Sequence, residues 1–172
     1  MATITDLVHD VINYLVAQCQ ASTLLGAAVP PVAIFDGPTP PGEPLTSPQR
    51  VWIGHDALAG GGDAGMATQA FAYVGNSAGR RREDGEVTCT AEAFTGDVTM
   101  SVSRAQCKAL VGAVEVLLRG TPGGLGPGDS SMGGLVQWSQ VSGPFTWTQL
   151  QDATGSSAMC VFRVTYVAYL NP

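Results

Sequence analysis

The chain has 172 residues, about the size of one ordinary domain, with 8 basic and 14 acidic side chains and a net charge of −6. With 45% hydrophobic residues it is too apolar to be disordered. It also lacks the basic excess that is typical of nucleic-acid-binding domains. A single lysine, Lys108, is fewer than a free monomer usually displays, so the composition indicates a surface covered in part by partners.

The charges are distributed unevenly along the chain. Residues 1–49 contain four acidic and no basic side chains, and three of the eight basic residues stand together as Arg80, Arg81 and Arg82. Gly and Pro contribute 22 and 11 residues. Many of them gather in a proline-rich loop at 37–49 and a glycine-rich loop at 120–134. A loop of that length inside a compact domain usually binds something or crosses a neighbour.

Targeting signals are not expected. The first residues lack a basic region followed by a short apolar run, so they do not resemble a secretory signal. The most apolar stretch, 21–35, is too short for a membrane span and is broken by two prolines. We therefore expect synthesis in a cytoplasm and no membrane partner. The wide spacing of the cysteines favours buried free thiols over a metal or disulfide framework: Cys19, Cys89, Cys107 and Cys160.

The first predicted element is an amphipathic helix. Apolar residues recur at helical spacing from Leu7 to Val16, with Thr5 or Asp6 as the expected N-cap and an end near Gln20. A further short turn is expected at 21–26. The next predicted elements are short strands at Val32–Phe35, Arg50–Gly54 and Gln69–Val74, an exposed hairpin tip at Arg80–Gly85, and an alternating strand at Val87–Phe94.

A second amphipathic helix is predicted for Ser103–Arg119. Ser103 with Gln106 resembles a capping box, although Ser101 could serve instead, and Gly120 followed by Pro122 ends the helix. The following glycines predict a flexible loop that no side chain fixes. Three strands then complete the chain: Leu135–Val141, Phe145–Leu150 and Ala158–Leu170.

This order of elements predicts an α+β fold. We expect one domain, 1–172, with an antiparallel or mixed β-sheet and the two main helices packed on one face. The tryptophans Trp52, Trp138 and Trp147 all fall in strands, where packing in the core is the first expectation. Trp147 follows Pro144 and Phe145, so it is also a candidate for an exposed anchor.

Catalytic and cofactor motifs are absent from the sequence. His9 is expected on a solvated helix face, and His55 with Asp56 has no further ligand at metal-binding spacing. Lys108 falls in the middle of a predicted helix, so the glycine loops form no phosphate-binding loop. Neither a nucleophile elbow nor a cysteine–histidine pair is visible. We therefore expect no enzyme activity, no cofactor and no metal site.

The arginine run is the clearest candidate for a contact surface. Arg80, Arg81 and Arg82 could contact phosphates, but the adjacent Glu83 and Asp84 cancel much of their field. Glu83, Asp84 and Glu86 resemble the acidic half of a salt-bridged tip. A protein–protein contact is therefore favoured, since arginine pairs well with carboxylates at interfaces. The proline-rich loop supplies two further interface candidates, Pro40 and Pro41.

The layout resembles the tail terminator (tail completion or neck) proteins of long-tailed bacteriophages. The resemblance rests on the opening helix at 6–16, the strand at 87–93, the helix at 103–119 and the closing strand at 161–169. It implies a ring-forming subunit, a homohexamer, located in the virion tail or neck. It also implies contact with the tail tube protein and the head–tail connector or stopper, around double-stranded DNA that passes without specific binding. A low-lysine, acidic subunit suits such a channel.

Two other interpretations stay open. The chain could be another virion ring protein, either a head–tail stopper or the tail tube subunit itself, which would self-polymerise. It could also be a cytosolic small-molecule-binding or enzymatic α+β domain that uses His55, Asp56 and the glycine loops.

Overall fold

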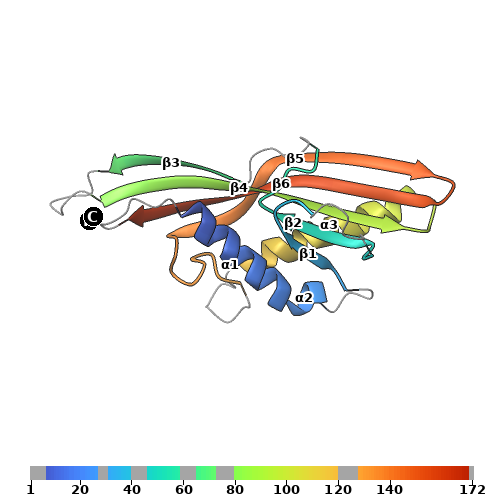
Figure 1. Cartoon of the computed structure of the whole chain (residues 1–172), viewed down its shortest axis with the longest axis horizontal. Helices are drawn as coiled ribbons and strands as arrows, with labels where there is room; N and C mark the ends of the chain where they lie inside the picture. The colour runs from blue at the N-terminus through green and yellow to red at the C-terminus, as the bar shows by residue number, and fades with distance from the viewer. Residues whose placement is uncertain are drawn as a thin grey trace.

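The computed structural model describes residues 7–26, 31–39, 46–58, 65–72, 80–119 and 128–170. Figure 1 shows one long sheet with the helices on one of its faces. The helices are α1 (Val8–Ala21), α2 (Thr23–Gly26) and α3 (Met100–Leu118). The strands are β1 (Ala33–Asp36), β2 (Gln49–Ile53), β3 (Gly65–Ala72), β4 (Arg80–Thr95), β5 (Trp138–Asp152) and β6 (Gly155–Leu170).

Among the described residues, the sheet contains six strands in the order β1-β2-β4-β6-β5, with β3 paired to β4. β1 and β2 are parallel and every other pair is antiparallel, so the sheet is mixed. β3 pairs with the first half of β4 and β2 with the second half, so these two strands share one edge of β4. The α+β class, with a mixed sheet and helices on one face, is confirmed.

The central pair of strands explains how the core forms. β4 and β6 are in register over fifteen residue pairs, from Arg81 opposite Leu170 to Thr95 opposite Ser156. Because side chains alternate in a strand, odd residues of β4 and even residues of β6 face the helices. These positions are buried in a continuous set: Glu83, Gly85, Val87, Cys89, Ala91, Ala93, Ala158, Cys160, Phe162, Val164, Tyr166 and Ala168.

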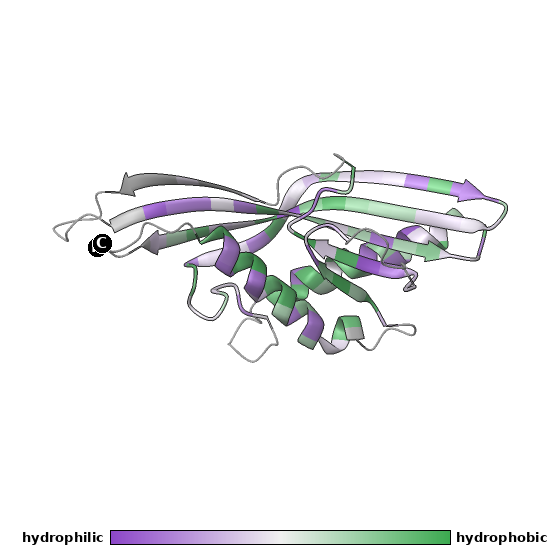
Figure 2. Cartoon of the chain, viewed as in Figure 1, coloured by the Kyte–Doolittle hydropathy of each residue, from purple (hydrophilic) through white to green (hydrophobic). Residues whose placement is uncertain are grey.

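The helices complete the core from below the sheet. α1 packs under β1, β2, β3 and β4, and α3 packs under β4, β6 and β5. Figure 2 shows hydrophobic and hydrophilic stretches on both helices, as an amphipathic pattern requires. The buried positions are Val11, Ile12, Leu15 and Cys19 of α1 and Ser103, Cys107, Leu110, Val111, Val114, Leu117 and Leu118 of α3. The two predicted helices are therefore confirmed, as is the predicted short turn, which forms α2.

The predicted helix caps are wrong. α1 has Leu7 as its N-cap, without a side-chain cap, so neither Thr5 nor Asp6 takes that position; both lie outside the described residues. α3 begins at Met100 with Thr99 as its N-cap. Ser103 therefore lies inside the first turn, where its hydroxyl donates to the Met100 carbonyl. No side chain caps α3, so the capping box is not formed.

The final part of the chain also departs from the prediction. The two strands predicted at 135–141 and 145–150 are one strand, β5, which starts later, at Trp138. Its pairing with β6 shifts between Ser142 and Thr146, where three residues of β5 lie opposite one of β6. Such a bulge interrupts the alternation, which is why the sequence pattern gives two strands instead of one.

The glycine-rich loop is partly fixed, contrary to the prediction. Residues 120–127 lie outside the described residues, but 128–134 form turns around Asp129. Its carboxylate accepts from the Ser131 backbone N–H at 2.8 Å and from the Gly133 N–H at 2.6 Å. Met132 is fully buried, with a positive φ of 51°. A carboxylate and one buried methionine therefore hold this part of the loop.

Replacing Asp129 by Ala is expected to lower the free energy of unfolding by about 1 kcal/mol at pH 7. The pKa of Asp129 lies below its ordinary value, first because the Ser131 hydroxyl donates to it and then because the Gly133 N–H does. Since the folded pKa is the lower one, the stabilisation is present above the unfolded pKa of about 4 and is lost as the pH falls. Urea unfolding at pH 7 and pH 2 checks this, and an equal difference at both pH values would contradict it.

Candidate interaction surfaces

The arginine run does not form a hairpin tip. β4 already begins at Arg80, and Arg82 pairs with Ala70 of β3 on one side and Tyr169 of β6 on the other. A charged run fits inside a strand when alternate side chains face water, and Arg82 is exposed. The side chains of Arg80 and Arg81 lie outside what the structure describes, as do Pro40 and Pro41 of the proline-rich loop.

The face of the sheet that carries no helix is lined by ion pairs. Arg82 pairs with Asp84 at 2.7 Å, Arg163 with Glu86 at 3.0 Å, and Arg50 with Glu92 at 3.0 Å. The even residues of β4 supply all three carboxylates, because those positions point away from the helices. Each of these cations is thus neutralised by a neighbour on the same face, which leaves little charge free to attract phosphates.

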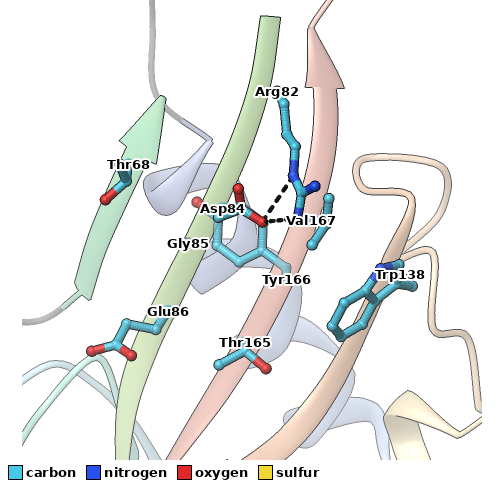
Figure 3. A pocket seen from close by; sticks show the side chains of 9 residues that line it. All are labelled: Thr68, Arg82, Asp84, Gly85, Glu86, Trp138, Thr165, Tyr166 and Val167. Atoms are coloured by element: carbon cyan, nitrogen blue, oxygen red, sulfur yellow. Dashed lines mark hydrogen bonds and ion pairs between the residues drawn. The ribbon is translucent and has the colours of Figure 1, made fainter. Parts of the chain in front are cut away.

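A shallow depression of about 330 Å³ lies on this face, beside the start of β4. Figure 3 shows Arg82 and Asp84 at its centre, Thr68 of β3 on one side and Trp138 of β5 on the other. Trp138 is 40% exposed, so the prediction that it packs in the core is wrong. An open hollow does not enclose a small molecule, whereas an exposed indole beside an ion pair suits a protein contact.

Glu83 and its neighbours Asp84 and Glu86 lie on opposite faces of the sheet. Glu83 is fully buried on the helix side, while Asp84 and Glu86 lie on the open face. Its Oε1 accepts from the Tyr166 hydroxyl at 2.8 Å and from the backbone N–H of Leu7 at 2.9 Å. A carboxylate from β4 therefore satisfies the amide at the start of α1, where the helix dipole also favours negative charge. The interpretation of Glu83 as part of a salt-bridged tip is wrong.

Gly85 leaves space for the Tyr166 ring, whose hydroxyl donates to Glu83. A Cβ at this position would overlap the Tyr166 ring, which lies across the glycine backbone. The two residues are directly opposite each other in β4 and β6. An aromatic ring that covers a cross-strand glycine stabilises the strand pair at a point without a side chain. The strand alternation Glu83, Gly85, Val87 is the sequence signal that indicates the burial of Glu83.

The edge strand β5 displays apolar side chains. Phe145 is 48% exposed, Trp147 40% and Leu150 64%. β5 is the last strand of the sheet, so its outer edge has no strand partner among the described residues. A long edge strand with exposed apolar residues is a typical association site. The alternative interpretation of Trp147 as an exposed anchor agrees with this exposure. Of the tryptophans, only Trp52 is buried, stacked on Phe35 at 5.6 Å.

Neither histidine belongs to a cluster of metal-ligating side chains in the described part of the chain. His9 is exposed on α1, as predicted. His55 takes part through its backbone: its N–H donates to the Thr88 carbonyl, and its own carbonyl accepts from the Thr90 hydroxyl. The described residues contain no group of three His, Cys, Asp or Glu side chains that could hold a metal ion. In the same part of the chain, no helix has both the length and the apolar character to cross a membrane.

All four cysteines are buried and free, as predicted. Burial raises the pKa of Cys19, Cys89 and Cys107 to about 12 and that of Cys160 to about 11. The reactive thiolate is therefore scarce in the folded protein at neutral pH.

We expect a thiol reagent to label no cysteine of the folded protein within minutes at pH 8, and all four once it is unfolded in urea. Mass spectrometry of the labelled protein counts the modified thiols. Rapid labelling of any cysteine without urea would contradict the described burial.

Comparison with solved structures gives several likenesses, of which one is described. The fold is similar to that of a chain in the virion of a native gene transfer agent particle, with a TM-score of 0.51 and 17% sequence identity. The match covers 95% of this chain and 100% of that chain. No protein-family model matches the sequence, and no curated protein matches it. At this identity the likeness establishes a shared fold.

Proposed function

We propose that the protein is a structural subunit of a phage-like virion, namely the tail terminator. Copies of it would form a homohexameric ring that caps the tail tube and joins it to the head–tail connector or stopper. The observation that carries the proposal is the full-length likeness to a chain of a gene transfer agent virion, which covers 95% of this chain. The resemblance of the element order to tail terminators supports the specific role.

The surfaces support an assembling subunit that DNA can pass. Exposed apolar residues on the edge strand β5 favour contact with other proteins, as in a ring. The three ion pairs on the open sheet face neutralise Arg50, Arg82 and Arg163. Because phosphate contacts need free cations, DNA would pass this face without being held. Arg80, Arg81 and Arg82, and the proline-rich loop with Pro40 and Pro41, are candidates for contacts with the tube or the connector.

The role is structural and needs no chemistry at a site. The depression beside Arg82 is shallow, and the His55 backbone is engaged with Thr88 and Thr90. Neither feature offers a substrate an enclosed place with a nucleophile or a metal. A small-molecule function would be supported if a metabolite stabilised the protein and His55→Ala removed that stabilisation.

Deletion of the gene tests the role of the protein. We expect heads and tails that remain separate, with tails of variable length, because nothing stops the polymerisation of the tube. Purified wild-type particles should contain the protein at a copy number that fits one hexameric ring, measured by quantitative mass spectrometry. A tube subunit would be present in many times more copies, and a stopper deletion would leave tails of normal length. Absence from purified particles would refute a virion role altogether.

A further inference from the structure

Two exposed cations differ from the other described cations because they form no ion pair. Arg50, Arg82, Arg119 and Arg163 each form an ion pair with a carboxylate. Arg104 and Lys108 are exposed on α3 and make no ion pair within the described part of the chain. They are four residues apart on one helix, so they lie on the same face one turn from each other. We call this pair the cationic flank.

Two exposed carboxylates are their counterparts. Most described acids have a partner: four are in ion pairs, Glu83 is buried against Tyr166, and four are tied into local turns, namely Asp56, Asp97, Asp129 and Asp152. Within the described residues, Asp10 and Asp36 are exposed and have neither a hydrogen bond nor an ion pair through their carboxylates. We call these two the acidic flank.

The fold places the two flanks under opposite halves of the sheet. Asp10 is on α1, which packs against β1, and Asp36 is the last residue of β1. Asp36 is opposite Ile53, whose buried side chain faces the helices, so Asp36 is on the helix side as well. The cationic flank is on α3, which packs under β4, β6 and β5, whereas α1 packs under β1, β2, β3 and β4. Apart from the β4 contacts that both helices make, the two helices therefore lie on opposite sides of β4, so the two flanks belong to opposite halves of the sheet.

We propose that the cationic flank of one copy binds the acidic flank of the next copy. The inference rests on the proposed ring and names its subunit interface. Opposite flanks on one chain make a heterologous, head-to-tail contact, and such contacts close into rings. Each exposed ion pair is weak by itself. Two cations that face two carboxylates nevertheless fix the orientation of one copy relative to the next. Turning one copy around would bring like charges together. The apolar side chains of the adjacent edge strand β5 supply contact area.

Charge-reversal variants test this interface. One variant carries Arg104→Glu and Lys108→Glu, so both its flanks are acidic; the other carries Asp10→Lys and Asp36→Lys, so both its flanks are basic. Because all four residues are exposed, we expect both variants to fold, and circular dichroism checks this. Each variant alone should self-associate with a dissociation constant raised by a factor on the order of 100, measured by sedimentation. An equimolar mixture should assemble again with alternating copies.

The matched control is the variant that carries all four substitutions. It has the net charge of the wild-type chain with the two flanks exchanged, and we expect it to assemble by itself. If the wild-type chain forms rings and both charge-reversal variants form them equally well, the flank contact is wrong and the proposed function stands. If the wild-type chain stays monomeric at every concentration, both the ring and its interface are refuted. Failure of the mixture to assemble would also overturn the interface.

Discussion

Replacing Glu83 by Ala is expected to lower the free energy of unfolding by about 3 kcal/mol. The carboxylate is fully buried and accepts hydrogen bonds from the Tyr166 hydroxyl and the Leu7 N–H. Its removal deprives the buried Tyr166 hydroxyl and the partly buried Leu7 N–H of this acceptor, and it opens a gap between α1 and the sheet. Equilibrium unfolding in urea, followed by circular dichroism, measures the change.

Three further variants separate the contributions. Asp84→Ala removes the neighbouring carboxylate, which faces solvent and pairs with Arg82, so we expect a much smaller effect. Glu83→Gln keeps an acceptor of similar shape and should cost less than Glu83→Ala. Tyr166→Phe removes one donor and should cost about 1 kcal/mol. A loss for Glu83→Ala no larger than that for Asp84→Ala would contradict the role assigned to this carboxylate.

Replacing Phe145 and Leu150 together by Thr is expected to weaken self-association by about 3 kcal/mol, roughly a hundredfold in Kd. Both side chains are exposed on β5, and an interface would remove their apolar surface from water. Threonine keeps the preference for strand structure, so the stability of the monomer should change little. Sedimentation over a range of concentrations measures the association.

The control for this pair is Leu58→Thr. Leu58 is 42% exposed and follows β2, which is not a neighbour of β5 in the sheet, so its replacement should leave association unchanged. If the Phe145 and Leu150 variant assembles at the same concentration as the wild-type chain, the apolar edge of β5 is not part of the subunit interface. If Leu58→Thr weakens association to the same extent, the effect is not specific to the edge.

The regular elements could be predicted because their patterns are local. The apolar stripe of α1 at Val11, Ile12 and Leu15 and the alternation along β6 each follow from the side chains that one element buries. The class of the fold then follows from the order of the elements. The bulge between Ser142 and Thr146 breaks the alternation along β5. The sequence pattern therefore predicts two strands where the structure has one.

The residues of the candidate surfaces were harder to predict because long-range contacts decide their environment. A run of arginines and carboxylates indicates a solvated turn, yet pairing with β3 and β6 makes it a strand that buries Glu83. The N-cap residue of α1 is Leu7, whose amide is satisfied by that same carboxylate, 76 residues away. Asp129 and Met132 likewise hold a loop whose glycines indicated only flexibility. In each case the deciding partner is distant in the sequence or contributed by the backbone.

Electron microscopy of the purified wild-type chain, at the concentrations where it self-associates, tests the proposed tail terminator ring. We expect closed single rings of six subunits, one layer thick, that add to the end of preformed tail tubes and stop their growth. Long tubes built from this chain alone would show a tube subunit instead. Particles without rotational symmetry, or monomers at every concentration, would contradict the account.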